Sequence, residues 1–173
     1  RPQQPFFVYV AFHEPHEPVA SPPDLVQRYM SAAQNEDEAQ YFANVTNVDL
    51  AVGRIVAALE RLDRRDNTLI IFSSDNGPET LNRYRTANRS YGRPTPLRGM
   101  KLWTTEAGFR VSGIMNWPAG IQQPAVSDQV VSSLDFLPTL CQLAGAEPPD
   151  DLQLDGTSFL PLLTGGSIQR DKP

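Results

Sequence analysis

Apolar positions form two short, nearly continuous runs along the chain, and a third segment also has the length of a strand. Residues 6–12 (FFVYVAF) are rich in β-forming side chains and predict a buried strand. Residues 68–72 (TLIIF) predict a second buried strand, and residues 110–117 (RVSGIMNW) predict a third, which ends at Pro118. A polar or turn-forming residue follows each run, as expected where a strand ends.

The longest periodic segment predicts a helix from about Asp37 to Leu62. Asn35 is the predicted N-cap, and acidic residues follow it where the helix dipole favours negative charge. The apolar positions of this segment are spaced by three and four residues, which is typical of one face of a helix: Tyr41, Val45, Val48, Val52, Ile55, Leu59 and Leu62.

Two shorter helices are predicted on either side of these elements. Ser21 is a candidate cap for a helix through about Met30, with prolines in its first turn. Residues 135–144 (DFLPTLCQLA) predict the other, and Gly145 is the predicted stop.

The order of a long helix, a short connection and a buried strand predicts an α/β fold with a mainly parallel sheet flanked by helices. Sheets of this kind place their chemistry at the carboxyl ends of the strands. His16 and Asp75 each lie just past the end of a predicted strand. We therefore expect a functional site to include both.

Length and composition fit a single domain over residues 1–173. The chain is 40% hydrophobic and 20% charged, and its formal net charge of −5 argues against nucleic acid as a partner. No apolar run approaches the roughly 20 residues of a membrane-spanning helix. A single cysteine, Cys141, excludes an internal disulfide and a cysteine-based zinc site, and we expect it to pack in the core. Because the sequence opens on Arg1 close to a predicted strand, we expect a longer protein.

Two polar clusters follow predicted strands. Asp75 and Asn76, with Gly77 after them, offer neighbouring oxygen ligands for a hard cation such as Ca²⁺, although the same residues also form ordinary turns. His13 and His16 are the only histidines, and they could act as acid or base, bind an anion or ligate a metal, or be surface residues.

A basic segment precedes the third predicted strand. Between Glu79 and Lys101 there are six basic residues and one acidic residue. Lys101 is a natural partner for a sulfate or phosphate group, and the alternative is a loop that is solvated or paired with acids elsewhere. Glu106 and Arg110, around a glycine turn, predict a structural ion pair.

Taken in order, these motifs resemble the formylglycine-dependent sulfatases of the alkaline-phosphatase-like superfamily. The resemblance runs from residue 6 to about residue 163, and it matches the later portion of the catalytic domain, after the nucleophile. The matching motifs are HxPHxP, VDxxVGRI, IIFSSDNG, PLRGMK, ExGxRV, WP, SSLDFLPTLCQLAG and LDGTSFLPLL.

The resemblance implies roles for four residues and a supporting role for His13. It implies that Asp75 and Asn76 supply two ligands of an active-site calcium. Lys101 would contact the sulfate, and His16 would bind the ester near its leaving oxygen. The family's glycine and proline in EGGxRVP are replaced by Ala107 and Ser112.

The family's C/S-x-P-x-R motif, whose Cys or Ser becomes formylglycine, does not occur in these residues, and Cys141 does not fit it. The resemblance therefore implies a sulfuric ester hydrolase that acts on a sulfate ester, inactive without a missing formylglycine segment. Two alternatives stay open: a phosphoester hydrolase of the same superfamily, and a non-catalytic binding module.

Two further expectations concern partners and compartment. The surface left by a missing half would favour self-association. Family membership favours a secreted, periplasmic or lysosomal setting. The triplets beginning at Asn44 and Asn88 are glycosylation sequons, which also occur by chance.

Overall fold

A computed structural model describes residues 4–80, 85, 87–121, 123–148 and 151–170. The chain divides into two compact units, which are described separately. Unit 1 comprises Arg1–Asp63 and Phe72–Ile114, and unit 2 comprises Arg64–Ile71 and Met115–Pro173. All four residues of the predicted site belong to unit 1.

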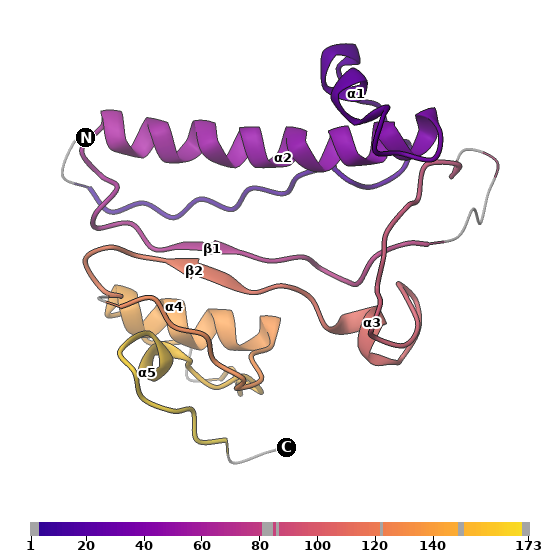
Figure 1. Cartoon of the computed structure of the whole chain (residues 1–173). Helices are drawn as coiled ribbons and strands as arrows, with labels where there is room; N and C mark the ends of the chain where they lie inside the picture. The colour runs from indigo at the N-terminus through magenta and orange to yellow at the C-terminus, as the bar shows by residue number, and fades with distance from the viewer. Residues whose placement is uncertain (1–3, 81–84, 86, 122, 149–150, 171–173) are drawn as a thin grey trace. The chain divides into compact units, whose positions relative to one another are not determined.

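The helices of unit 1 form a packed pair. Helix α1 (Pro23–Tyr29) lies against the N-terminal part of α2 (Glu36–Arg61), as Figure 1 shows. Asn35 caps α2, because its side chain accepts a hydrogen bond of 2.9 Å from the Glu38 amide. The predicted long helix and its cap are thus confirmed. The pair encloses a small core formed by Leu25, Val26, Ala39 and Ala43.

The predicted cap of the first helix is wrong in its details. Helix α1 starts after Pro22, which makes no side-chain capping bond. The hydroxyl of Ser21 instead donates to the carbonyl oxygen of Gln40 at 2.9 Å, and its amide donates to the Gln40 side chain at 2.9 Å. Ser21 therefore ties the chain before α1 to α2, a long-range role that local patterning does not reveal.

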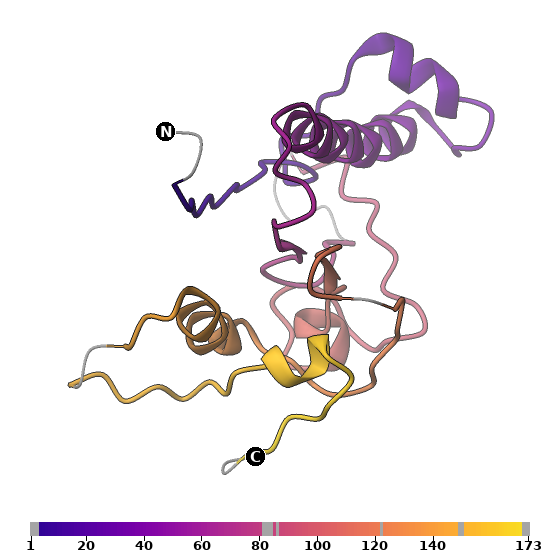
Figure 2. The same cartoon turned by 90° about the vertical axis from the view of Figure 1, so that its left-hand side faces the viewer.

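Residues 6–12 are not a buried strand in this chain. They have no strand pairing, and most of their side chains are exposed: Phe7 to 72% and Tyr9 to 83%. Figure 2 shows the N-terminal end of the segment lying to one side of α2, away from the helix. A strand of this composition needs hydrogen-bonding neighbours at its edges and apolar cover on its faces. The described residues supply neither, and for this reason the prediction fails here.

Two of the predicted strands are present in shortened form. Strand β1 (Ile70–Phe72) and strand β2 (Ile114–Asn116) form a two-stranded antiparallel sheet. No other strand occurs among the described residues. A mainly parallel sheet is therefore not seen in the described part of the chain, and it stays a prediction.

Unit 2 is organised around a short 3₁₀ turn, Ser133–Asp135, which leads into α4 (Phe136–Ala144). Gly145 ends α4 in the left-handed conformation at φ 64°, as predicted. Fully buried Phe159, just before α5 (Leu160–Leu163), packs edge-on against Phe136. Cys141 is a free thiol of intermediate burial.

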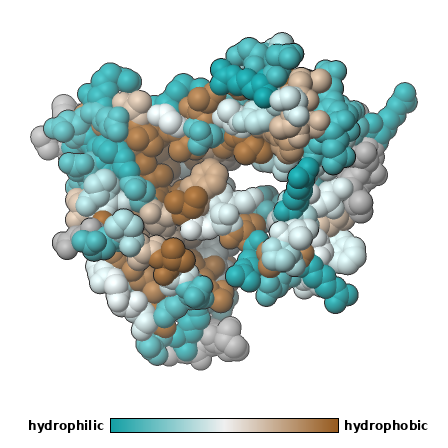
Figure 3. Space-filling view, viewed as in Figure 1, coloured by the Kyte–Doolittle hydropathy of each residue, from teal (hydrophilic) through white to brown (hydrophobic). Residues whose placement is uncertain are grey.

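Much of the apolar surface of unit 1 faces solvent. Figure 3 shows apolar side chains gathered on one face around α2, where Val45 and Ile55 are 48% and 38% exposed. Among the described residues α2 alone has the length and hydropathy of a membrane span. It also buries Glu38 and Asn44 against its own unit, so we interpret it as a helix of a folded unit. The predicted self-association is compatible with this surface and stays a prediction.

Candidate functional site

The loop after β1 carries Asp75 and Asn76 on a tightly held backbone. Asp75 is exposed and Asn76 is half-buried, with its amide nitrogen donating to the Gly77 carbonyl at 3.0 Å. The amide of Gly77 donates to the Gly108 carbonyl at 2.9 Å. A Cβ on Gly77 would lie 1.7 Å from the Ala107 carbonyl oxygen, so only glycine lets the loop approach this closely.

Lys101 lies on a loop in direct contact with the chain that leaves this turn. Its backbone amide donates to the carbonyl of Pro78 at 3.0 Å. Pro78 is two residues beyond Asn76, so the segments carrying the predicted cation ligands and the predicted lysine lie side by side in unit 1. The Lys101 side chain is half-buried.

His16 occupies an exposed turn within the HxPHxP motif, residues 13–18. Its amide donates to the carbonyl of His13 at 2.9 Å, and the two imidazole rings meet edge to face at 5.9 Å. Nδ1 of His16 lies 2.6 Å from the Glu17 carbonyl oxygen. Because a carbonyl only accepts, Nδ1 carries a hydrogen, and Nε2 is the ring atom left to exchange a proton with a ligand.

Glu17 anchors the histidine turn to the basic segment. Glu17 is only 8% exposed, and its Oε1 accepts from the Arg89 amide at 2.6 Å and the Ser90 hydroxyl at 3.2 Å. Oε2 accepts from the Val19 amide at 3.0 Å. The sequence gives no local signal for this role, since 72 residues separate Glu17 from Arg89.

Two arginines of the basic segment are paired with acids of α2. Arg89 Nε lies 2.8 Å from Asp37 Oδ1, and Arg93 pairs with Glu38, whose side chain is 1% exposed. The amide of Gln34 hydrogen-bonds the Glu38 carboxylate and, with Arg93, holds its pKa below the usual value against the opposing effect of burial. For these two arginines, pairing with acids elsewhere is confirmed.

A polar pocket of about 530 Å³ opens between α2 and this segment. Glu38 and Arg93 contribute its charges, and its remaining lining is polar or glycine. The residues that line it are Gln34, Glu38, Thr80, Ser90, Tyr91, Gly92 and Arg93.

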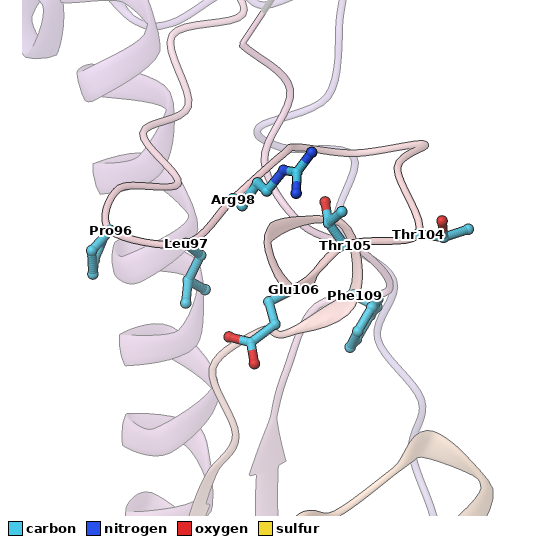
Figure 4. A pocket seen from close by; sticks show the side chains of 7 residues that line it. All are labelled: Pro96, Leu97, Arg98, Thr104, Thr105, Glu106 and Phe109. Carbon is cyan, nitrogen blue, oxygen red and sulfur yellow. The ribbon is translucent and has the colours of Figure 1, made fainter.

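A second pocket, of about 400 Å³, lies beside α3 (Glu106–Phe109) and is shown in Figure 4. The side chains of Arg98 and Glu106 point in different directions there, so they do not form one polar cluster. Glu106 pairs with Arg110 at 3.1 Å, which confirms the predicted ion pair. None of the four predicted site residues lines either pocket.

The similarity of this chain to known proteins decides its family. The family model described as Sulfatase matches residues 1–146. The chain belongs to the sulfatase family. It is 38% identical to human arylsulfatase A over 165 residues and 37% identical to the uncharacterized sulfatase YdeN of Escherichia coli K12 over 166 residues. These matches confirm the resemblance inferred from the motifs.

The match covers most of this sulfatase chain but a minor part of its relatives. It spans 95% of this chain and 30% of human arylsulfatase A, and 92% and 27% in the case of YdeN. The crystal structure of Ps i-CgsB aligns with a TM-score of 0.79 at 33% identity, over 94% of this chain and 34% of that one. These neighbours give the sulfatase chain an alkaline-phosphatase-like α/β fold.

The geometry of α3 explains one departure from the sulfatase motif. At the position where the family's usual motif has its first glycine, Ala107 is accommodated with 1% exposure. The retained Gly108 has no such freedom, because its Cβ would lie 1.9 Å from the Trp103 carbonyl oxygen. Of the two glycine positions in the motif, only position 108 leaves no room for a side chain, and it is the one at which this chain has glycine.

The donor set after β1 is chemically suited to a hard cation. Asp75 supplies a carboxylate, and Asn76, with its amide nitrogen turned to Gly77, keeps its amide oxygen as a ligand. Two oxygens fall short of the usual six to eight ligands of calcium. The described residues contain no cluster of three or more His, Cys, Asp or Glu side chains that could hold a metal. The residues present thus fit part of a calcium site.

Proposed function

We propose that this chain is part of a sulfuric ester hydrolase, to which it contributes His16, Lys101, Asp75 and Asn76. Membership of the sulfatase family supports the reaction class. The observation that carries the assignment is the hydrogen bond of 3.0 Å between the Lys101 amide and the Pro78 carbonyl. It holds the proposed sulfate-binding loop against the proposed cation-binding loop.

In this proposal the two basic residues have different tasks. The Lys101 ammonium binds the sulfate oxygens and stabilises the negative charge that grows on them. His16, whose Nδ1–H donates to the Glu17 carbonyl at 2.6 Å, acts as the imidazolium and gives its Nε2 proton to the leaving oxygen, which leaves the neutral ring. Anchoring of Glu17 to Arg89 and Ser90 positions the imidazole for that transfer.

Asp75 and Asn76 would hold one edge of a calcium ion, and further ligands would come from elsewhere in the protein. A bound calcium ion supplies positive charge that polarises the sulfate oxygens. The role of this chain is to present the carboxylate and the amide oxygen on a backbone fixed by the bond of 2.9 Å between Gly77 and Gly108.

The nucleophile of the proposed reaction lies outside these 173 residues. The family's C/S-x-P-x-R motif, the source of formylglycine, does not occur in them. We therefore propose that the 173-residue chain by itself hydrolyses no sulfate ester, and that it sits in the later portion of a catalytic domain built on a mainly parallel sheet. The chain spans less than a third of human arylsulfatase A.

Substitution in the full-length protein tests the assignment. We expect Lys101→Ala and His16→Ala each to lower the turnover of an aryl sulfate by at least about 10²-fold. His13→Ala is the matched control, because this exposed imidazole neighbours His16 at 5.9 Å but has only a supporting role. Near-parental turnover in both test variants would refute the assignment.

The same assay separates the alternatives. A phosphoester hydrolase would turn over an aryl phosphate faster than the aryl sulfate. A non-catalytic binding module would turn over neither. Hydrolysis of the aryl sulfate alone, lost in Lys101→Ala, is the result that we expect.

A further inference from the structure

The polar pocket of unit 1 has the size of a binding site but contains none of the four residues assigned to catalysis. Its volume of about 530 Å³ lies within the range of small-molecule sites in proteins. Seven residues line it, and none has an aliphatic hydrophobic side chain. Its chemistry therefore differs from that of the usual, largely apolar ligand pocket.

Arg93 is the best-placed donor in this pocket. Its guanidinium is held on one edge by the buried carboxylate of Glu38, and it lies 5.7 Å from the centre of the Phe42 ring. At the same time 66% of its side chain is exposed. A guanidinium carries five N–H donors, so pairing with one carboxylate leaves donors for the oxygens of a ligand.

The walls of the pocket connect it to both loops of the proposed catalytic site. The hydroxyl of Ser90 donates to Glu17, the residue after His16, at 3.2 Å. On the other side, Thr80 Oγ1 lies 3.0 Å from the sulfur of Met100, the residue before Lys101. The pocket therefore borders the segments that would hold the sulfate, where the alcohol part of a substrate must lie.

The lining selects for a hydroxyl-rich ligand. Covering a carboxylate, a guanidinium, an amide and three hydroxyls with a sterol or a bare aryl ring would remove their water without replacing its hydrogen bonds. A sugar ring offers both donors and acceptors at its edge and so can replace that water. Because Glu38 balances the charge of Arg93, a second negative group on the ligand is not required.

We propose that this pocket is a subsite for a sugar unit of a sulfated saccharide, with Arg93 as its main hydrogen-bond donor. The proposal rests on the proposed sulfate ester hydrolysis and names its substrate class. It predicts that specificity among sulfate esters depends on Arg93, a residue distinct from the four that act on the sulfate.

Arg93→Lys in the full-length protein is the decisive variant, since it keeps a positive charge beside Glu38 but removes the guanidinium fork. The substrates are monosulfated disaccharides of galactose, glucose and N-acetylglucosamine, compared with an aryl sulfate and a sterol sulfate. We expect Arg93→Lys to lower kcat/KM for the preferred disaccharide, relative to the aryl sulfate, at least about tenfold, mainly through KM. Arg110→Gln, an exposed arginine outside the pocket, is the matched control and should leave this ratio unchanged.

Calorimetric titration keeps the test independent of turnover. Binding of the sulfated disaccharide that is weakened in Arg93→Lys supports the subsite, even if the protein hydrolyses no sulfate ester and the proposed function fails. An unchanged disaccharide-to-aryl ratio in Arg93→Lys, tighter binding of the sterol sulfate, or no detectable binding of any disaccharide would each overturn the subsite. Loss of aryl sulfate turnover in Lys101→Ala would still support the proposed function in those cases.

Discussion

Asp135 is the residue on which the stability of unit 2 depends most clearly. Its side chain is fully buried, and its carboxylate accepts hydrogen bonds from the amides of Ser132 at 2.7 Å and Thr157 at 2.8 Å. Arg170 adds two contacts, at 3.0 and 2.6 Å. Although burial opposes ionisation, these donors together hold the pKa of Asp135 below its usual value, with Arg170 the strongest of them.

Asp135→Ala removes all four acceptor contacts at once. Two backbone amides lose a partner, at about 1 kcal/mol each, and a charge-assisted pair with Arg170 is lost, at about 1.5–3 kcal/mol. We therefore expect the free energy of unfolding of unit 2 to fall by about 3.5–5 kcal/mol, within the range for other broken buried pairs. The lower end of this range applies if water hydrates the guanidinium of Arg170 after its partner is removed, since 27% of the Arg170 side chain is exposed.

Urea denaturation followed by tryptophan fluorescence measures this loss. The chain has two tryptophans, of which Trp117 belongs to unit 2 and Trp103 to unit 1. A Trp103→Phe background makes the signal specific to unit 2. Asp128→Ala, which removes an exposed carboxylate of the same unit, is the control and should shift stability by less than about 0.5 kcal/mol. Equal midpoints for Asp135→Ala and the control would refute the reasoning.

Three further outcomes are expected. Gly77→Ala, with its Cβ 1.7 Å from a carbonyl oxygen, should lose at least about 2 kcal/mol of unfolding free energy. Gly53→Ala in α2, with nothing within 4 Å, should gain about 0.5–1 kcal/mol. Both glycines belong to unit 1, so urea denaturation is followed through Trp103 in a Trp117→Phe background. The pKa of Glu38 is lowered from 4.5 in the folded chain, so its ionised carboxylate gives its full stabilisation above pH 4.5. This stabilisation is lost as the pH falls through the lower pKa of the folded chain. Glu38→Gln should therefore flatten the acid side of a plot of unfolding free energy against pH. The 173-residue chain alone should bind Ca²⁺ more weakly than about micromolar in calorimetric titration, because two oxygens cannot complete its shell; micromolar affinity would contradict the partial-site interpretation.

Elements fixed by local chemistry could be predicted from sequence. The spacing of apolar residues and the Asn35 cap locate α2, and Gly145 marks the end of α4, because each signal acts within a few residues of the backbone that it shapes. Residues 6–12 show the opposite case. Their composition predicts a buried strand, but burial and pairing depend on neighbours that the described chain does not supply.

For the candidate site, the motifs name the residues but not their contacts. Asp75 and Lys101 stand out in their motifs, yet the backbone bond beside them, between residues 78 and 101, has no sequence signature. Glu17 and Arg93 were missed as contributors, because their partners are more than 50 residues away. Long-range pairs of this kind follow from the fold and not from local pattern.

The contact between Gly77 and Gly108 has a mechanical consequence. It joins two backbones directly, with no side chain between them to yield or rotate. If capture of a cation by Asp75 displaced its turn, α3 would have to travel with it as one rigid piece. Substitution of an exposed residue of that helix, such as Phe109, would then leave the coupling between the two segments intact. Substitution of Gly77 or Gly108 would break it, because a Cβ at either position meets backbone atoms.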